Sequence, residues 1–165
     1  MPDIFQMEKQ RQDMWCWAAV AVSVDHYFAP LSTSTQCRVA RLVLDLDECC
    51  TDPDPCNTPA SLQVSLTKVE KWKETRPRPL RFTEIQREID ALRPVCVFIR
   101  WNGGGGHFVV ISGYWLSAEG DEWVEVSDPL FPNSTVLYDV LVSAYQSAQD
   151  PLGGGQWSAS CLVGV

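Results

Sequence analysis

The chain has 165 residues, of which 45% are hydrophobic, and this length favours a single domain over residues 1–165 with a substantial core. Its 13 Lys and Arg against 21 Asp and Glu give a net charge of −8, which argues against nucleic acid as a partner. The sequence contains no apolar run of the roughly 20 residues that a membrane-spanning helix needs, so no membrane partner is expected.

Apolar residues at helical spacing predict a first helix over residues 14–28, with one apolar face to bury and Asp13 as its N-cap. A second helix is expected at about 35–46, after a polar segment at 32–35 that could cap it. The segment 47–57 contains two prolines and is predicted to be a loop rich in turns.

Capping residues predict the next two helices. Thr58 and Pro59 form an N-cap and N1 pair, which predicts a third helix that extends to about Trp72. Thr83 and Gln86 form a capping box that opens a short fourth helix.

The spacing of apolar residues changes after Pro94, where compact apolar runs or alternating apolar and polar residues predict strands. These runs are 95–101, 107–115, 123–126 and 157–163. Residues 138–145 are ambiguous between helix and strand, and we favour helix. Helices come first, in a part of about 1–93, and strands second, in a part of about 94–165. This order predicts an α+β fold with a mostly antiparallel sheet.

Cys16 is the first candidate for a catalytic residue. It lies in the first turn of the predicted helix, where the partial positive charge of the N-terminus favours the thiolate, the nucleophilic form of cysteine. A cysteine nucleophile needs a base within hydrogen-bond reach, and the chain has two histidines. His26 follows Cys16 by ten residues on the same helix, about 15 Å along its axis, which leaves His107 as the base.

His107 begins a predicted strand directly after four glycines, residues 103–106, which we interpret as the mobile edge of a cleft. The base needs a group that fixes its tautomer. Asp128 follows the next predicted strand, and the short connection between the two strands places the end of one beside the start of the other. We therefore expect Asp128 to orient His107, with Asn133 as the second choice.

The chemistry also requires donors for an oxyanion. The amide of Cys16 at the helix start can supply one donor, and the side-chain amide of Gln10 or Gln12 can supply another. We expect the cleft to be lined by residues close to these groups in the sequence: Trp17, Trp101, Gly105 and Gly106.

Gln10, followed six positions later by Cys16-Trp17-Ala18, resembles the active-site signature of papain-like cysteine peptidases. The segments 15–19, 106–114 and 127–129 together resemble the compact bacterial branch of that group. This branch includes secreted effector proteases of plant pathogens and relatives of bacteriocin-leader peptidases. The resemblance runs in blocks from about residue 10 to residue 145.

The resemblance implies a papain-like fold and assigns a role to each candidate. It makes Cys16 the nucleophile, His107 the base and Asp128 the orienting group. It also favours Gln10 over Gln12 in the oxyanion hole. The chain departs from papain in offering an aspartate where papain has an asparagine.

Four of the seven cysteines cluster in the sequence: Cys37, Cys49, Cys50 and Cys56. Two disulfides are expected there, either Cys37–Cys49 with Cys50–Cys56 or Cys37–Cys50 with Cys49–Cys56. A zinc site is a minority alternative because the cluster has no Cys-x-x-Cys pair, and four reduced cysteines are another. The odd count leaves at least one free thiol.

These features predict a cysteine peptidase that hydrolyses peptide bonds through a thioester acyl-enzyme, with no cofactor. We expect a protein or peptide substrate, with a dedicated inhibitor or immunity protein as a further candidate partner. Two alternatives stay open. One is a glutamine deamidase or transglutaminase-like toxin with the same triad, and the other is a non-catalytic binding module with a vestigial site.

The cysteine content favours a protein that is secreted or delivered as an effector into an oxidising environment. The first residues do not have the basic and apolar regions of a secretory signal peptide. We therefore expect either that such a segment was removed or that the chain is cut from a longer protein.

Overall fold

The computed structural model describes residues 4–165 and shows the expected α+β fold. Within these residues, six strands form one sheet in the order β1-β6-β2-β3-β4-β5, and every neighbouring pair is antiparallel. The strands are β1 (Trp72–Arg76), β2 (Val95–Trp101), β3 (Gly106–Leu116), β4 (Glu122–Ser127), β5 (Ser134–Leu137) and β6 (Gly155–Val163). The helices are α1 (Cys16–Phe28), α2 (Gln36–Leu44), α3 (Leu62–Lys68), α4 (Phe82–Asp90) and α5 (Tyr138–Ser143), with the 3-10 helices η1 (Asp47–Cys50) and η2 (Asp54–Cys56).

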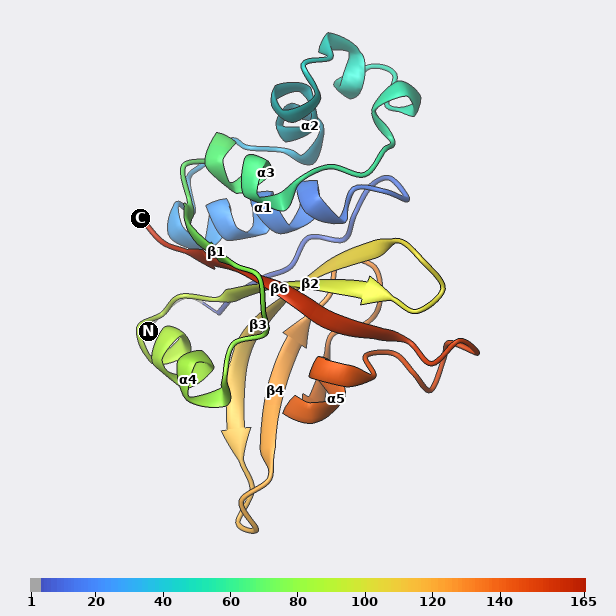
Figure 1. Cartoon of the computed structure of the whole chain (residues 1–165). Coiled ribbons are helices and arrows are strands. Elements are labelled where there is room, and N and C mark those ends of the chain that lie inside the picture. The colour runs from blue at the N-terminus through green and yellow to red at the C-terminus, as the bar shows by residue number, and fades with distance from the viewer. Residues whose placement is uncertain (1–3) are drawn as a thin grey trace.

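Helices cover both faces of the sheet (Figure 1). The helices α1, α2 and α3 form a layer on one face, and α4 and α5 lie on the other. Alternate residues of β2 serve the two faces: Cys96 packs in the core around α1, whereas Val97 and Ile99 pack in the core that contains Ile85 of α4. A strand buried on both faces explains why residues 95–101 are a nearly continuous apolar run.

The helix that carries Cys16 is buried more completely than its sequence pattern predicted. Every residue of α1 from Cys16 to Asp25 is buried, so the expectation of one apolar face was wrong. The reason is that α1 lies between α2 and α3 on one side and β3 on the other. The predicted cap was also wrong, because Trp15 takes the N-cap position without a side-chain cap and Asp13 is exposed.

Caps explain where α2 and α3 begin. The hydroxyl of Thr35 accepts a hydrogen bond from the Arg38 amide at 3.4 Å, which confirms the polar segment before α2 as its cap. The cap predicted at residues 58–59 was wrong, because α3 begins after Ser61, whose hydroxyl accepts from the Val64 amide at 3.2 Å. Glu70, with φ of 59°, takes the chain out of the helical path, and β1 follows.

The start of α4 differs from the predicted capping box of Thr83 and Gln86. Its N-cap is Arg81, two residues earlier. The carboxylate of Glu84 accepts a hydrogen bond from the Arg81 amide at 2.7 Å and two at 2.8 Å from the Arg78 guanidinium. A negative group held at the helix N-terminus replaces the predicted polar pair.

The four strands predicted from apolar runs are confirmed as β2, β3, β4 and β6, and the helix favoured at residues 138–145 is confirmed as α5. Two strands were not predicted. The predicted third helix ended at about Trp72, the first residue of β1, and the rest of β1 and all of β5 were left without an assigned element. Both lie at the edges of the sheet and are largely exposed, so neither needs a strong apolar signal.

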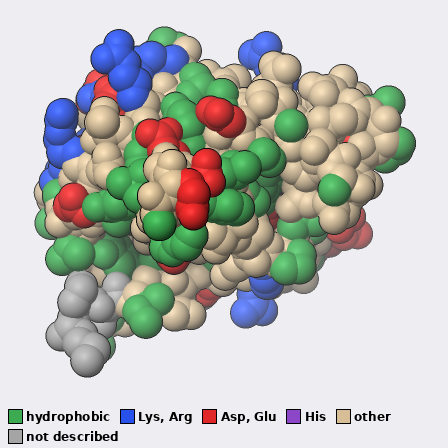
Figure 2. All heavy atoms as spheres, turned by 90° about the horizontal axis from the view of Figure 1, so that it is seen from below, with side chains coloured by type: hydrophobic (Ala, Val, Ile, Leu, Met, Phe, Trp, Pro, Cys, Tyr) green, Lys and Arg blue, Asp and Glu red, His purple; other side chains and the backbone are tan. Residues whose placement is uncertain are grey.

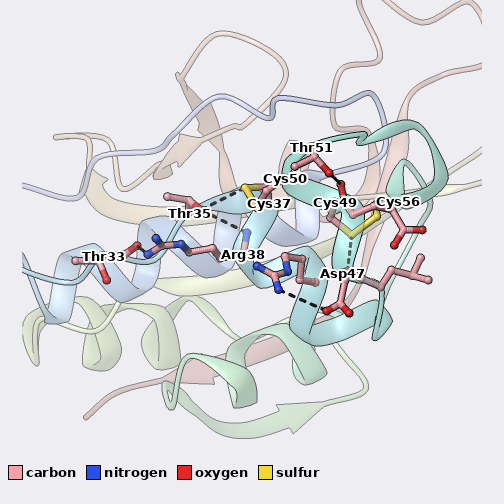
Figure 3. The surroundings of a disulfide bond; sticks show 12 residues. Thr33, Thr35, Cys37, Arg38, Asp47, Cys49, Cys50, Thr51 and Cys56 are labelled. Atoms are coloured by element: carbon pink, nitrogen blue, oxygen red, sulfur yellow. Dashed lines mark hydrogen bonds and ion pairs between the residues drawn. A yellow bond between two sulfur atoms is a disulfide. The ribbon is translucent and has the colours of Figure 1, made fainter.

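Two disulfides, Cys37–Cys50 and Cys49–Cys56, hold α2, η1 and η2 together (Figure 3). This is the second of the two pairings expected from the sequence. Because the four sulfurs form two disulfide bonds, no thiolate of the cluster is free to bind zinc. The cysteines that stay free are Cys16, Cys96 and Cys161.

The face of the molecule seen from below in Figure 1 shows hydrophobic and acidic side chains interspersed at its centre, with Lys and Arg nearer its edge (Figure 2). The acidic groups on this face agree with the net charge of −8. Among residues 4–165, no helix combines the length and the apolar character required to cross a membrane.

Candidate active site

The residues around Cys16 are held by two indole hydrogen bonds. The Nε1 of Trp15 donates to the carbonyl of Cys56 at 2.8 Å, and the Nε1 of Trp17 donates to the carbonyl of Thr58 at 3.0 Å. Both acceptors lie at or just after the Cys49–Cys56 disulfide. The tryptophans on either side of Cys16 therefore fix the first turn of α1 against a cross-linked segment.

His107 is the second residue of β3 and is only 3% exposed. The indole of Trp101 stacks on its imidazole with ring centres 5.8 Å apart, and the ring of Phe131 meets it edge-on at 6.0 Å. The other histidine, His26, lies in the last turn of α1, where its Nε2 is 3.1 Å from the carbonyl oxygen of Ser34. The two aromatic neighbours of His107 restrict the orientation of its ring.

Asp128 lies behind the imidazole of His107 and is fully buried. Its Oδ1 is 2.8 Å from the Nε2 of His107. The pairing of Val110 with Ser127 in the β3–β4 hairpin brings the end of one strand beside the start of the other. Asn133, the second choice, supports Asp128 itself: its Oδ1 accepts a hydrogen bond from the backbone amide of Asp128 at 2.9 Å.

The side chains of Cys16 and His107 line the same cavity of about 610 Å³, and the interaction with Cys16 contributes to the raised pKa of His107. Because Nε2 of His107 faces Asp128, Nδ1 is the ring nitrogen left for the thiol. One side of the cavity, which we call the helical wall, consists of Asp13, Met14, Cys16, Trp17, Pro59 and Ala60. The other side, which we call the sheet wall, consists of Phe98, Trp101, Gly104, Gly105, Gly106, His107, Phe108 and Leu130.

The charged groups of the site shift one another's pKa values. Burial by itself lowers the pKa of His107, but the hydrogen bonds to Asp128 and Cys16 and the charge of Asp128 raise that pKa to about 9. Burial raises the pKa of Asp128, but the hydrogen bonds from His107 and Tyr145 and the charge of His107 outweigh it, so the pKa is lowered. The site therefore favours an imidazolium beside a carboxylate at neutral pH.

The two glutamines considered for the oxyanion hole lie just outside the cavity. The Nε2 of Gln10 donates to the carbonyls of Gln12 at 3.1 Å and Asp13 at 2.7 Å. Its Oε1 is buried and has no hydrogen-bond partner among residues 4–165. The carbonyl of Gln12 also accepts from the Trp15 amide at 3.1 Å. In this structure the side chain of Gln10 shapes the turn before Cys16.

Sequence reasoning missed Lys9, which joins the segment before Cys16 to the loop after β4. Its ammonium donates to the carbonyls of Asp128 at 2.6 Å and Phe131 at 2.7 Å, and the amide of Gln10 donates to the carbonyl of Pro129 at 2.8 Å. A lysine gives no sequence signal for backbone carbonyls as its partners. Tyr145, whose hydroxyl contacts Asp128, was also missed.

A cysteine at the start of a buried helix, facing a histidine at the start of an antiparallel strand, defines the class of papain-like thiol hydrolases. Residues 2–147 match the family model described as papain-like cysteine protease AvrRpt2, and the chain belongs to this family of bacterial effector proteases. The protein is therefore a papain-like cysteine protease, a hydrolase with a protein substrate. No curated protein shows significant similarity to the chain.

Proposed function

We propose that the protein hydrolyses peptide bonds with Cys16 as nucleophile, His107 as acid and base, and Asp128 as the orienting carboxylate. The observation that supports this most strongly is that Cys16 and His107 line the same open cavity, with the Asp128 carboxylate 2.8 Å from Nε2 of the His107 ring. These are the groups that covalent catalysis by cysteine requires, in the required order.

In the first step, the thiolate of Cys16 attacks the carbonyl carbon of the scissile peptide bond, and the carbonyl π electrons move to oxygen. The backbone amide of Cys16 belongs to the first turn of α1 and has no acceptor within the helix, so it can donate to this oxyanion. Gln10 can become a second donor if its Nε2 exchanges one of its two carbonyl partners for the oxyanion.

The intermediate then collapses to a thioester. The oxyanion electrons re-form the carbonyl, the C–N bond breaks, and protonated His107 gives its proton to the departing amine. Neutral His107 next takes a proton from water, whose oxygen attacks the thioester carbonyl. The C–S bond breaks, the carboxylic product leaves, and Cys16 returns to its thiolate beside protonated His107.

Mass spectrometry of a peptide library treated with the native protein tests this proposal. We expect new peptide termini, whose formation is lost in a Cys16→Ala variant. A Cys161→Ala variant is the matched control, because it removes a free thiol outside the cavity. Equal cleavage by the native protein and Cys16→Ala would refute the assignment of the nucleophile.

The same spectra separate the two alternative functions. A gain of about one dalton at glutamine without new termini identifies a deamidase, because ammonia leaves as the side-chain thioester forms and water then hydrolyses that thioester to glutamate. Absence of both products, together with no labelling of Cys16 by a thiol-reactive electrophile in the folded protein, identifies a non-catalytic module.

A further inference from the structure

The two oxygens of the Asp128 carboxylate have different partners. Oδ1 faces Nε2 of His107 and accepts from the backbone amides of Leu130 at 2.8 Å and Phe131 at 2.9 Å. Oδ2 accepts a hydrogen bond from the hydroxyl of Tyr145 at 2.5 Å. Tyr145 is 1% exposed, so this bond is formed away from solvent. The acidic group behind the imidazole is therefore held from both sides.

The backbone of Tyr145 is fixed where it meets the start of β6. Its amide donates to the carbonyl of Gly155 at 2.9 Å, and the amide of Gly155 donates back to the carbonyl of Tyr145 at 3.0 Å. Gly154 has φ of 76°, and a Cβ there would lie 2.0 Å from the carbonyl oxygen of Tyr145. Only glycine allows this approach, so the main chain of Tyr145 is held beside the start of β6.

The ring of Trp101 is a neighbour of both the His107 ring and the Tyr145 ring. It stacks on His107 at 5.8 Å with an interplanar angle of 18°, and on Tyr145 at 6.3 Å with an angle of 16°. A side chain at Gly155 would enter this stack, since its Cβ would lie 2.7 Å from the Trp101 ring. The phenol and the imidazole are thus held by a shared aromatic neighbour as well as by a shared carboxylate.

We propose that Tyr145 is a positioning residue for the reaction: its hydroxyl fixes the rotation of the Asp128 carboxylate and thereby directs His107 toward Cys16. This inference depends on the proposed roles of those three residues. Without the phenol donor, Oδ2 of Asp128 would be a charged oxygen without that buried hydrogen bond, and the carboxylate could rotate away from Nε2. Lys9 cannot replace the phenol, because its ammonium contacts the carbonyl of Asp128.

The variant Tyr145→Phe removes the hydroxyl and keeps the ring against Trp101. Because a hydrogen bond to a charged group is lost while the substrate cavity is unchanged, we expect kcat to fall about tenfold with KM unaltered. Tyr138→Phe is the matched control, since the Tyr138 hydroxyl donates to the carbonyl of Leu80 at 2.7 Å and does not contact the triad. We expect this control to keep the native kcat.

A second readout does not depend on peptide hydrolysis. The rate at which iodoacetamide alkylates Cys16, followed by peptide mapping across a range of pH, has an alkaline inflection that reports deprotonation of His107. The titratable and charged groups around this pair are Asp128, Tyr145 and Lys9 on the sheet side, and Asp13 on the helical wall of the cavity. We expect the inflection to move to lower pH in Tyr145→Phe, because a misaligned carboxylate stabilises the imidazolium less, and to stay in place in Tyr138→Phe.

The two readouts distinguish the possible failures. A lower kcat and a shifted inflection in Tyr145→Phe alone support the positioning role. A native kcat and a native inflection in that variant overturn it, as does a loss of activity that only follows a loss of thermal stability and leaves the inflection unmoved. If the native protein cleaves no peptide, the proposed function fails, and the alkylation profile still decides the role of Tyr145.

Discussion

The two walls of the cavity position their reactive groups in different ways. On the helical wall, Cys16 is placed by burial of α1 and by indole bonds to a disulfide-linked segment. On the sheet wall, His107 is placed by Asp128, which itself accepts bonds from backbone amides and a phenol. Packing therefore sets where the sulfur lies, whereas a polar network sets the charge and orientation of the ring.

The largest expected loss of activity follows removal of the reactive group on the sheet wall, the imidazole of His107. The variant His107→Ala removes the base, and we expect a fall in kcat/KM of about 10³-fold or more, as for the loss of a triad member. Steady-state hydrolysis of a cleaved library peptide measures it. His26→Ala is the control, because His26 lies in the last turn of α1, and it should keep native activity. Similar losses in both variants would contradict the choice of base.

A smaller loss of kcat is expected from a change at Asp128, which lies behind the imidazole of His107. Asp128→Asn keeps the shape of the side chain but removes the charge that stabilises the imidazolium, so we expect kcat to fall about 10²-fold. The pKa of His107, about 9, predicts an alkaline limb of the native kcat/KM profile near that pH, and in the variant this limb should move to lower pH. A variant with the native profile would show that the carboxylate does not control the ring.

The ion pair of His107 and Asp128 also makes the free energy of unfolding depend on pH. The folded-state pKa of His107, about 9, lies above its ordinary 6.5, so protonation favours the folded state. This stabilisation is complete below pH 6.5 and is lost as pH rises through 9, and it amounts to at most on the order of 3 kcal/mol. Denaturant unfolding at several pH values measures it. In Asp128→Asn the decline between these pH values should be much weaker, and an unchanged decline would assign it to other groups.

The smallest expected effect on activity comes from the helical wall. Replacing Cys49 and Cys56 together by Ala removes one disulfide, and we expect the free energy of unfolding to fall by about 2 kcal/mol. Because the indole acceptors are backbone carbonyls, kcat per folded molecule should change less than in Asp128→Asn. A loss of kcat larger than in that variant would mean that the helical wall also controls the charges.

The sequence contained the main features of both walls, to different extents. Apolar runs predicted the strands around His107, and the short β3–β4 connection placed Asp128 beside it, as found at 2.8 Å. The predicted cap of α2 was confirmed, but those of α1, α3 and α4 were wrong. For α1 the reason is that capping rules are local, whereas its start depends on Trp15 contacting Cys56, 41 residues away. The strand β1 was missed because its exposed edge position allows a polar sequence.

The contact between Tyr145 and Asp128 could not be predicted from sequence patterns. A buried tyrosine needs a partner for its hydroxyl, but nothing in residues 138–145 indicates that the partner is Asp128. The contact depends on Gly154, which admits the main-chain carbonyl of Tyr145 at a distance that a Cβ would block, and on Gly155, where a Cβ would meet the ring of Trp101. Such a contact joins three segments and follows only from the packed fold.

The most direct test of the central claim, that Cys16 and His107 act as one reactive pair, is labelling of the native protein with a peptide-based epoxide followed by mass spectrometric mapping. We predict a single adduct on Cys16, which is abolished in His107→Ala and retained in His26→Ala. An adduct on Cys96 or Cys161 with Cys16 unmodified, or equal labelling of Cys16 in His107→Ala and in the native protein, would contradict the claim.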